Sequence, residues 1–226
     1  MSEPGLILFR IPFVPNETIQ LTKDELNHLR ALRLQNDSTT VQIRDGAGGL
    51  FNYLYLPTSK QLTLQTKEFV PNKSIRKKIA IALPKGNRLD FFLQKVTEIG
   101  LDEVIFLVFR HSIRKEFNLE RAEKIVKEAA AQSKQTEILK LSIESAKDWM
   151  EAHKESLVVF HPFGKDPFSI QGLYGKIPVI GPEGGFHGDE EVWMENNQIP
   201  KLTLPGGVLR TETCGIVAAS FLVYGS

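Results

Sequence analysis

Two glycine-rich segments near the carboxyl end of the chain carry the residues best suited to chemistry. One apolar stretch ends in Ile180-Gly181-Pro182-Glu183-Gly184-Gly185-Phe186, and a second runs into Pro205-Gly206-Gly207-Val208-Leu209-Arg210-Thr211-Glu212-Thr213. Glycine accepts left-handed backbone and leaves its amide bare, so such loops can close around a small ligand. No nucleotide-binding fingerprint explains them, because Gly46-Ala47-Gly48-Gly49 lacks the third glycine of a dinucleotide loop and no Walker-type segment occurs.

Charged side chains accompany both loops. Glu183 lies in the first loop, while Arg210 and Glu212 stand where a terminal helix is expected to begin. A carboxylate there can accept a proton or hold a hydroxyl group, and an arginine can stabilise an anion or clamp a phosphate. Two plainer alternatives are a tight turn that needs glycine only for its shape, and a structural ion pair between Arg210 and either carboxylate.

The composition excludes several classes of protein. With 28 basic and 27 acidic residues the chain has no overall charge signature of a nucleic-acid binder, although Lys73 to Arg88 is basic without an acid. That run is either a solvated linker or an RNA-facing patch. A single cysteine, Cys214, excludes an intrachain disulfide, and the histidine spacing predicts no metal site. No apolar stretch is long enough to span a membrane, so we expect a soluble, cytoplasmic protein.

The first seventy residues read as short strands separated by turns. The predicted strands are Leu6 to Phe9, Ile19 to Leu21, Val41 to Arg44, Phe51 to Leu56 and Leu62 to Thr66. One helix interrupts them, because Thr22 and Glu25 have the spacing of a capping box. So many short strands predict a small barrel over residues 1–72.

From residue 73 the pattern changes to alternating strands and helices, which predicts a mostly parallel sheet wrapped by helices over residues 73–226. Ligands of such sheets bind beyond the carboxyl ends of the strands. Three ends are expected to meet there: His161-Pro162-Phe163, Gly181 to Gly185, and Leu204 to Leu209.

Taken in order, several segments resemble one known family, the bacterial ribosomal RNA small subunit methyltransferase E group of the knotted SPOUT methyltransferases. The segments that carry the resemblance are His28-Leu29 through Leu32-Arg33-Leu34, Asp45-Gly46-Ala47-Gly48, Lys85-Gly86-Asn87-Arg88, Gln94 to Gly100, Glu128 to Ser133, Ile180 to Phe186 and Leu209 to Thr213.

The resemblance implies an α/β fold with a carboxyl-terminal trefoil knot, preceded by a PUA-like, RNA-binding barrel. It also implies a homodimer that uses S-adenosylmethionine, without a metal, to methylate N3 of a uridine in 16S ribosomal RNA of the small subunit. We predict Arg210 as the residue that stabilises the uridine anion and Glu183 as the proton acceptor. The predicted cofactor contacts are His161, Pro162, Gly181, Pro182, Glu183, Gly184, Gly185, Leu204, Gly206, Leu209 and Thr211. The predicted RNA contacts are Arg10, Arg30, Arg33, Lys85, Arg88 and Lys95.

The sequence departs from the family pattern at three places. Ser133 is followed by Lys134-Gln135 in place of the usual arginine and proline, His187 stands where a serine or threonine commonly caps a helix, and Pro205 replaces a glycine. Two other functions compete with the main prediction. One is a non-catalytic RNA-binding or ribosome-assembly factor, and the other is a knotted methyltransferase acting on another RNA, at a ribose 2′-hydroxyl or on transfer RNA.

Overall fold

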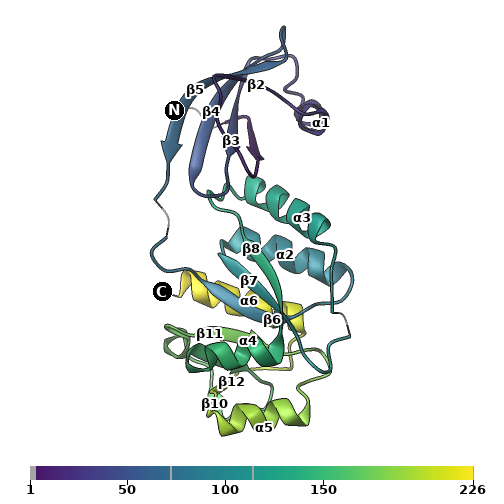
Figure 1. The fold of residues 1–226 in the computed structure, drawn as a ribbon, viewed down its shortest axis with the longest axis vertical. Coiled ribbons are helices and arrows are strands. Elements are labelled where there is room, and N and C mark those ends of the chain that lie inside the picture. The colour runs from purple at the N-terminus through teal and green to yellow at the C-terminus, as the bar shows by residue number, and fades with distance from the viewer. Residues whose placement is uncertain (1–3, 72, 114, 226) are drawn as a thin grey trace. The chain divides into compact units, whose positions relative to one another are not determined.

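The computed structural model describes residues 4–71, 73–113 and 115–225, and the chain forms two compact units (Figure 1). The first unit draws on Met1–Ser74 together with Lys127–Ile138, and the second on Ile75–Val126 and Leu139–Ser226. Each unit has its own buried apolar cluster. The segment 127–138 thus groups with residues that precede it by more than fifty positions, which no pattern in the sequence predicted.

The first unit is built on a five-stranded sheet with the order β1-β3-β4-β5-β2, in which only β1 and β3 are parallel. Burial alternates strictly along β4, so its inward face packs Phe51, Tyr53 and Tyr55 into the core. The elements of this unit are β1 (Leu6–Phe9), β2 (Thr18–Gln20), α1 (Lys23–Ala31), β3 (Thr39–Arg44), β4 (Gly49–Leu56) and β5 (Gln61–Phe69).

The predicted capping box begins α1. Thr22 Oγ1 accepts a hydrogen bond from the Glu25 amide at 3.3 Å, and Glu25 Oε2 accepts one from the Thr22 amide at 2.7 Å. Two otherwise unpaired amides are thereby satisfied, which fixes where the helix starts. Glu25 also binds the Arg10 guanidinium, at 2.6 Å and 2.9 Å, and so ties α1 to the end of β1.

The second unit is an α/β fold around a seven-stranded sheet in which every neighbouring pair is parallel, with the order β10-β12-β9-β11-β6-β7-β8. β9 and β11 are buried along their whole length, as strands covered on both faces should be. The strands are β6 (Lys78–Ala82), β7 (Glu103–Val108), β8 (Lys140–Ser145), β9 (Leu157–Phe160), β10 (Asp166–Pro167), β11 (Ile177–Ile180) and β12 (Lys201–Thr203). The α-helices of this unit are α2 (Asn87–Ile99), α4 (Ala146–His153), α5 (Gly188–Asn196) and α6 (Thr211–Tyr224), while α3 (Leu119–Gln132) begins in the second unit and ends in the first.

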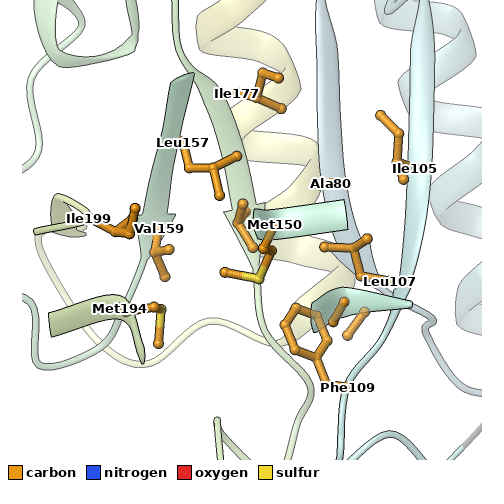
Figure 2. Packing of buried hydrophobic residues seen from close by; sticks show 13 residues of the cluster. Ala80, Ile105, Leu107, Phe109, Met150, Leu157, Val159, Ile177, Met194 and Ile199 are labelled. Carbon is orange, nitrogen blue, oxygen red and sulfur yellow. The ribbon is translucent and has the colours of Figure 1, made fainter. Parts of the chain in front are cut away.

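Helices cover both faces of this sheet. On one face Met150 of α4 and Met194 of α5 pack among Leu107, Leu157 and Val159 (Figure 2). On the other face α6 packs against α2, β6 and β11. A side chain at Gly215 of α6 would lie 2.6 Å from Ile81, so this glycine permits the helix backbone to approach the sheet closely.

The helices of the described residues include none with both the length and the apolar character needed to cross a bilayer.

Candidate functional site

A cavity of about 660 Å³ lies at the carboxyl ends of β12, β9 and β11, three consecutive strands of the sheet. This volume is within the range of small-molecule sites, and parallel sheets bind ligands at this edge. The cavity is lined by Phe160, His161, Pro162 and Phe163 after β9, by Ile180, Gly181, Pro182, Glu183, Gly185 and Phe186 after β11, by Leu202, Leu204 and residues 206–211 around β12 and the start of α6, and by Arg88, Glu191 and Cys214.

The structure therefore brings the predicted loops together. Every residue predicted to contact the cofactor lines this cavity except Gly184, and Arg210 lines it as well. A carbon added at Gly184 would meet His111 at 3.7 Å, on the side of the loop away from the lining.

Close packing and one hydrogen bond shape the loop after β11. A carbon added at Gly181 would lie 2.6 Å from the Phe186 ring, so the ring occupies the place of a side chain there. Gly185 has φ +77°, and its amide closes a turn by donating to the Pro182 carbonyl at 2.9 Å. Thr211 Oγ1 donates to the Gly181 carbonyl at 3.1 Å and so fixes the start of α6 against this loop.

Two cations hold Glu183 at the cavity. Its carboxylate lies 2.8 Å from Lys85 Nζ and 2.5 Å from Arg88 NH1. The hydrogen bond from Lys85, opposed by burial and reinforced by the charges of Lys85 and Arg88, lowers the pKa of Glu183. A carboxylate with a lowered pKa is a weak proton acceptor, so in this arrangement Glu183 is better suited to orienting the two cations.

The arginine that bridges the two loop carboxylates is Arg88, not Arg210. Arg88 Nε lies 3.7 Å from Oε1 of the buried Glu212, whose Oε2 has no hydrogen-bond partner among the described residues. Arg210 is exposed, and within the described residues it forms an ion pair with neither Glu183 nor Glu212. The alternative of a structural pair for Arg210 is therefore not realised here.

His161 is held at both ring nitrogens. The Phe163 amide donates to Nδ1 at 3.1 Å, which requires Nδ1 to be unprotonated, so Nε2 carries the proton and donates to Glu191 Oε1 at 2.8 Å. Sequence reasoning missed Glu191, because no motif links it to a histidine thirty positions away. Burial alone would raise the pKa of Glu191, but hydrogen bonds from Lys201 and His161 outweigh it and lower the pKa.

Cys214 lines the cavity from α6. Burial raises the pKa of its thiol to about 12, so the sulfur stays protonated and unreactive at neutral pH. Over the residues that the structure describes, there is no group of three or more His, Cys, Asp and Glu side chains that could hold a metal ion.

The predicted RNA contacts are distributed over both units. In the first unit Arg10 binds Glu25 at 2.6 Å and Arg30 binds Asn27 Oδ1 at 3.1 Å, whereas Arg33 is exposed. In the second unit Lys95 binds Glu98 at 2.8 Å, and the remaining two are the partners of Glu183. Arg10 is thus already engaged in structural hydrogen bonds, while Arg33 is accessible.

Comparison with known proteins identifies relatives of the whole chain. The family of the RNA methyltransferase domain matches residues 71–223. The ribosomal RNA small subunit methyltransferase E of Rickettsia conorii is 27% identical over 218 residues, which cover 90% of this chain and 88% of the relative. The protein of the same name from Bacillus subtilis is 25% identical, with 92% and 90% covered.

Solved structures share the fold. The crystal structure of a probable rRNA-methyltransferase from Porphyromonas gingivalis is 26% identical and superposes with a TM-score of 0.78 over 96% of both chains. A ribosomal RNA small subunit methyltransferase E from Neisseria gonorrhoeae, bound to S-adenosyl methionine, is 21% identical and superposes with a TM-score of 0.79 over 95% of both chains. Because the family match spans more than half of the chain, including every residue of the cavity, the chain belongs to the RNA methyltransferase domain family.

Proposed function

We propose that this protein is a cytoplasmic, S-adenosylmethionine-dependent methyltransferase that modifies N3 of a uridine in 16S ribosomal RNA. The observation that carries the proposal is the cavity at the carboxyl ends of β12, β9 and β11, within a domain of the RNA methyltransferase family. The names of the relatives, which span most of this chain, support the ribosomal substrate.

The residues of the cavity fit such a cofactor. Apolar side chains from three strand ends can cover a purine ring, and the glycines between them leave backbone amides and carbonyls available for its edge and for a ribose. Gly206 has φ +105°, which suits a loop whose backbone approaches a ligand closely. The residues available for these contacts are Phe160, Ile180, Leu202 and Leu209 for the ring, and Gly185 and Gly206 for the backbone contacts.

Bound S-adenosylmethionine supplies a methyl group already activated on a sulfonium. The chain must then align the acceptor, and the uridine must lose its N3 proton before it can attack. Arg210 lies exposed on the cavity wall at the start of α6, where its guanidinium can stabilise negative charge on the uracil oxygens. Glu183 keeps Lys85 and Arg88 at the cavity; the proton acceptor role predicted for it would require these ion pairs to loosen.

A trefoil knot is part of this proposal. β12 follows β11 in the chain but lies beyond β9 in the sheet, and α6 then returns to pack against β6 and β11. The last segment therefore passes back across the loops that follow β9 and β11. Such a crossing is needed for a knot, which is rare among protein folds.

A homodimer is proposed on the character of α6. On this helix Ile216, Val217 and Val223 are apolar side chains that remain partly exposed. Phe163 and Val208, at the cavity, are 83% and 76% exposed. A second copy of the chain over these surfaces would bury them and would add its own residues to the edge of the site.

Contact with RNA is proposed for the predicted basic residues and for the curled sheet of the first unit, which we interpret as a PUA-like barrel. Arg33 and Lys85 are charged side chains at exposed positions of the first and second unit, respectively. Phosphate contacts of this kind position an RNA without reading its sequence.

The decisive experiment is to incubate the protein with labelled S-adenosylmethionine and small ribosomal subunits, and in parallel with naked 16S RNA, followed by mass spectrometry of the nucleosides. We expect 3-methyluridine. A 2′-O-methylated nucleoside would assign the enzyme to another RNA reaction, and no product together with no heat on calorimetric titration of the cofactor would leave a non-catalytic RNA-binding factor.

A further inference from the structure

Two side chains that line the cavity, His161 and Glu191, form a polar chain with Lys201. Lys201 Nζ, from β12, lies 2.5 Å from Glu191 Oε2, and Glu191 Oε1 accepts the hydrogen bond from His161 Nε2 at 2.8 Å. All three side chains are less than one-third exposed, so solvent screens these contacts only in part. Glu191 stands at the centre of this chain and comes from α5.

The polar chain continues into an apolar stack. The His161 ring lies against Phe186, with centroids 5.9 Å apart and planes 14° apart. Phe186 in turn occupies the place of a side chain on Gly181, at the end of β11. A displacement of the His161 ring would therefore be passed to the loop after β11.

These contacts link the three strands whose carboxyl ends form the cavity. Lys201 is the first residue of β12, His161 follows the end of β9, and Gly181 follows the end of β11. Glu191, the residue at the centre of this chain, lies in the first turn of α5, outside both glycine-rich segments. One carboxylate thus connects β12 with the segments that follow β9 and β11.

We propose that Glu191 is a positioning residue of the cofactor site, which, together with the Phe163 amide, fixes the tautomer and the orientation of His161 and thereby the wall formed by His161 and Phe186. The inference rests on the proposed function for the identity of the ligand. Glu191 acts through His161 and contributes to cofactor binding, whereas it has no part in the transfer of the methyl group.

Removing the carboxylate has a definite structural consequence. In Glu191→Ala the Nε2 proton of His161 and the ammonium group of Lys201 both lose their acceptor, and a single 3.1 Å contact from the Phe163 amide is left to favour the Nε2–H tautomer. The ring is then held on one side only. In Glu191→Gln the amide oxygen can still accept from Nε2, so the conservative variant should restore the position of the ring.

The tautomer is measured first, without any ligand, by two-bond nitrogen-15 to proton correlation spectroscopy of the full chain, with His161 identified by a His161→Gln variant. We expect the Nε2–H tautomer in the wild type and in Glu191→Gln, and a mixture or exchange broadening in Glu191→Ala. An unchanged His161 signal in a folded Glu191→Ala would overturn the inference.

Affinity is measured next, by calorimetric titration with S-adenosylmethionine. We expect Kd to rise about tenfold or more in Glu191→Ala and to change by less than about threefold in Glu191→Gln, with little change in kcat at saturating cofactor. The matched control is Glu195→Ala, one turn further along α5, since Glu195 lies 3.6 Å from Lys201 and is not a partner of His161. Its affinity should equal that of the wild type.

Three results contradict the inference. The first is an equal loss of cofactor affinity in Glu191→Gln and Glu191→Ala with the tautomer unchanged, which would make Glu191 a direct ligand contact. The others are a loss of affinity in Glu195→Ala equal to that in Glu191→Ala, and a fall in kcat without a change in Kd. If the wild type itself binds no S-adenosylmethionine, the proposed function fails, and the ligand-free tautomer measurement then decides the role of Glu191.

Discussion

Arg88, in the first turn of α2, lies between the carboxylates of the two glycine-rich loops, and its position there determines what Arg210 can do. Since Glu183 and Glu212 already have a cation beside them, Arg210 is not needed to neutralise either. Its guanidinium can therefore meet an anion that arrives with the substrate.

Replacing Arg210 should consequently affect the reaction more than the binding of the cofactor. For Arg210→Ala we expect kcat to fall about 100-fold, because a donor to the developing uracil anion is lost, while the Kd of S-adenosylmethionine changes by less than about threefold. Single-turnover methylation and calorimetry measure the two quantities. Arg121→Ala, which removes an exposed arginine paired with Asp90, is the control; equal losses of rate and affinity in Arg210→Ala would instead make Arg210 a binding residue.

At the scale of single elements, the loop after β11 offers a matched pair of glycines. Gly181→Ala would place a methyl carbon 2.6 Å from the Phe186 ring, whereas Gly184→Ala would meet its nearest neighbour, His111, at 3.7 Å. We expect Gly181→Ala to lower the free energy of unfolding by about 1–3 kcal/mol and to weaken cofactor binding, because the ring must move.

Gly184→Ala should leave both quantities nearly unchanged. Thermal unfolding and cofactor titration of the two variants test this directly. If the two substitutions were equally tolerated, the contact between Phe186 and Gly181 would not shape the cavity.

Helix α1 gives a prediction for acid stability. Burial raises the pKa of Glu25, but hydrogen bonds from Arg10 and Thr22 outweigh it, so the pKa in the folded protein is below the ordinary value of 4.5. A carboxylate whose pKa is lowered by folding stabilises the fold at pH values above its pKa in the unfolded chain. This stabilisation is lost as the pH falls through its pKa in the folded protein. Glu25 should therefore stabilise the protein at neutral pH and not in acid.

The substitution Glu25→Gln removes this charge and tests whether the carboxylate stabilises the protein more at neutral than at acid pH. We expect it to lower the free energy of unfolding by about 1 kcal/mol at about pH 7, with a difference that shrinks as the pH falls below about 4.5. Urea unfolding at several pH values measures the difference in the free energy of unfolding between the variant and the wild type, and its change with pH. Glu17→Gln serves as a control elsewhere in the same unit, and a difference that grew toward acid pH would contradict the assignment.

At the scale of the whole molecule, the exposed apolar side chains at the cavity and the partly exposed ones along α6 predict the state of association. Light scattering on a size-exclusion column should give about twice the chain mass of 25.5 kDa, because a second copy would cover the exposed apolar residues. Val208→Glu, at the 76% exposed position, should shift the mass toward the monomer. A monomer over the whole accessible concentration range would exclude the proposed dimer.

Binding of RNA should depend on salt, while binding of the cofactor should not. Each phosphate contact releases counterions, so the affinity for 16S RNA should fall steeply between about 50 and 200 mM salt. Filter binding at several salt concentrations gives the slope. The substitution Lys85→Ala should reduce this slope, and an affinity that does not change with salt would contradict the proposed phosphate contacts.

Regular elements could be read from the sequence because their periodicity is local. Leu89, Phe92, Leu93 and Val96 recur at helical spacing and lie in α2, and the continuous apolar run from Leu157 to Phe160 is β9. The capping box at Thr22 also holds, since it depends on residues three apart. The order of the strands could not be read, because β12 pairs with β9 through contacts about forty residues apart in sequence.

The residues that line the candidate site could also be predicted from local sequence. The loops at the strand ends are marked by their glycines, and their residues could therefore be named as the lining of a site. The roles of Arg88 and Glu191 could not, because they depend on pairing across distances of 95 and 30 positions. No spacing rule covers such pairs.

The register of β6 has a consequence for how the protein reaches this structure. One neighbour of β6, the strand β7, follows closely in sequence, but the other is β11, in which Val179 aligns with Ala80 about one hundred residues earlier. Until β11 has paired with β6, one edge of the apolar strand β6 lacks its hydrogen-bonding partner, and long-range parallel pairing is slow. Refolding from denaturant should therefore compete with aggregation, and its yield should improve on dilution or with a chaperone that shields bare strand edges.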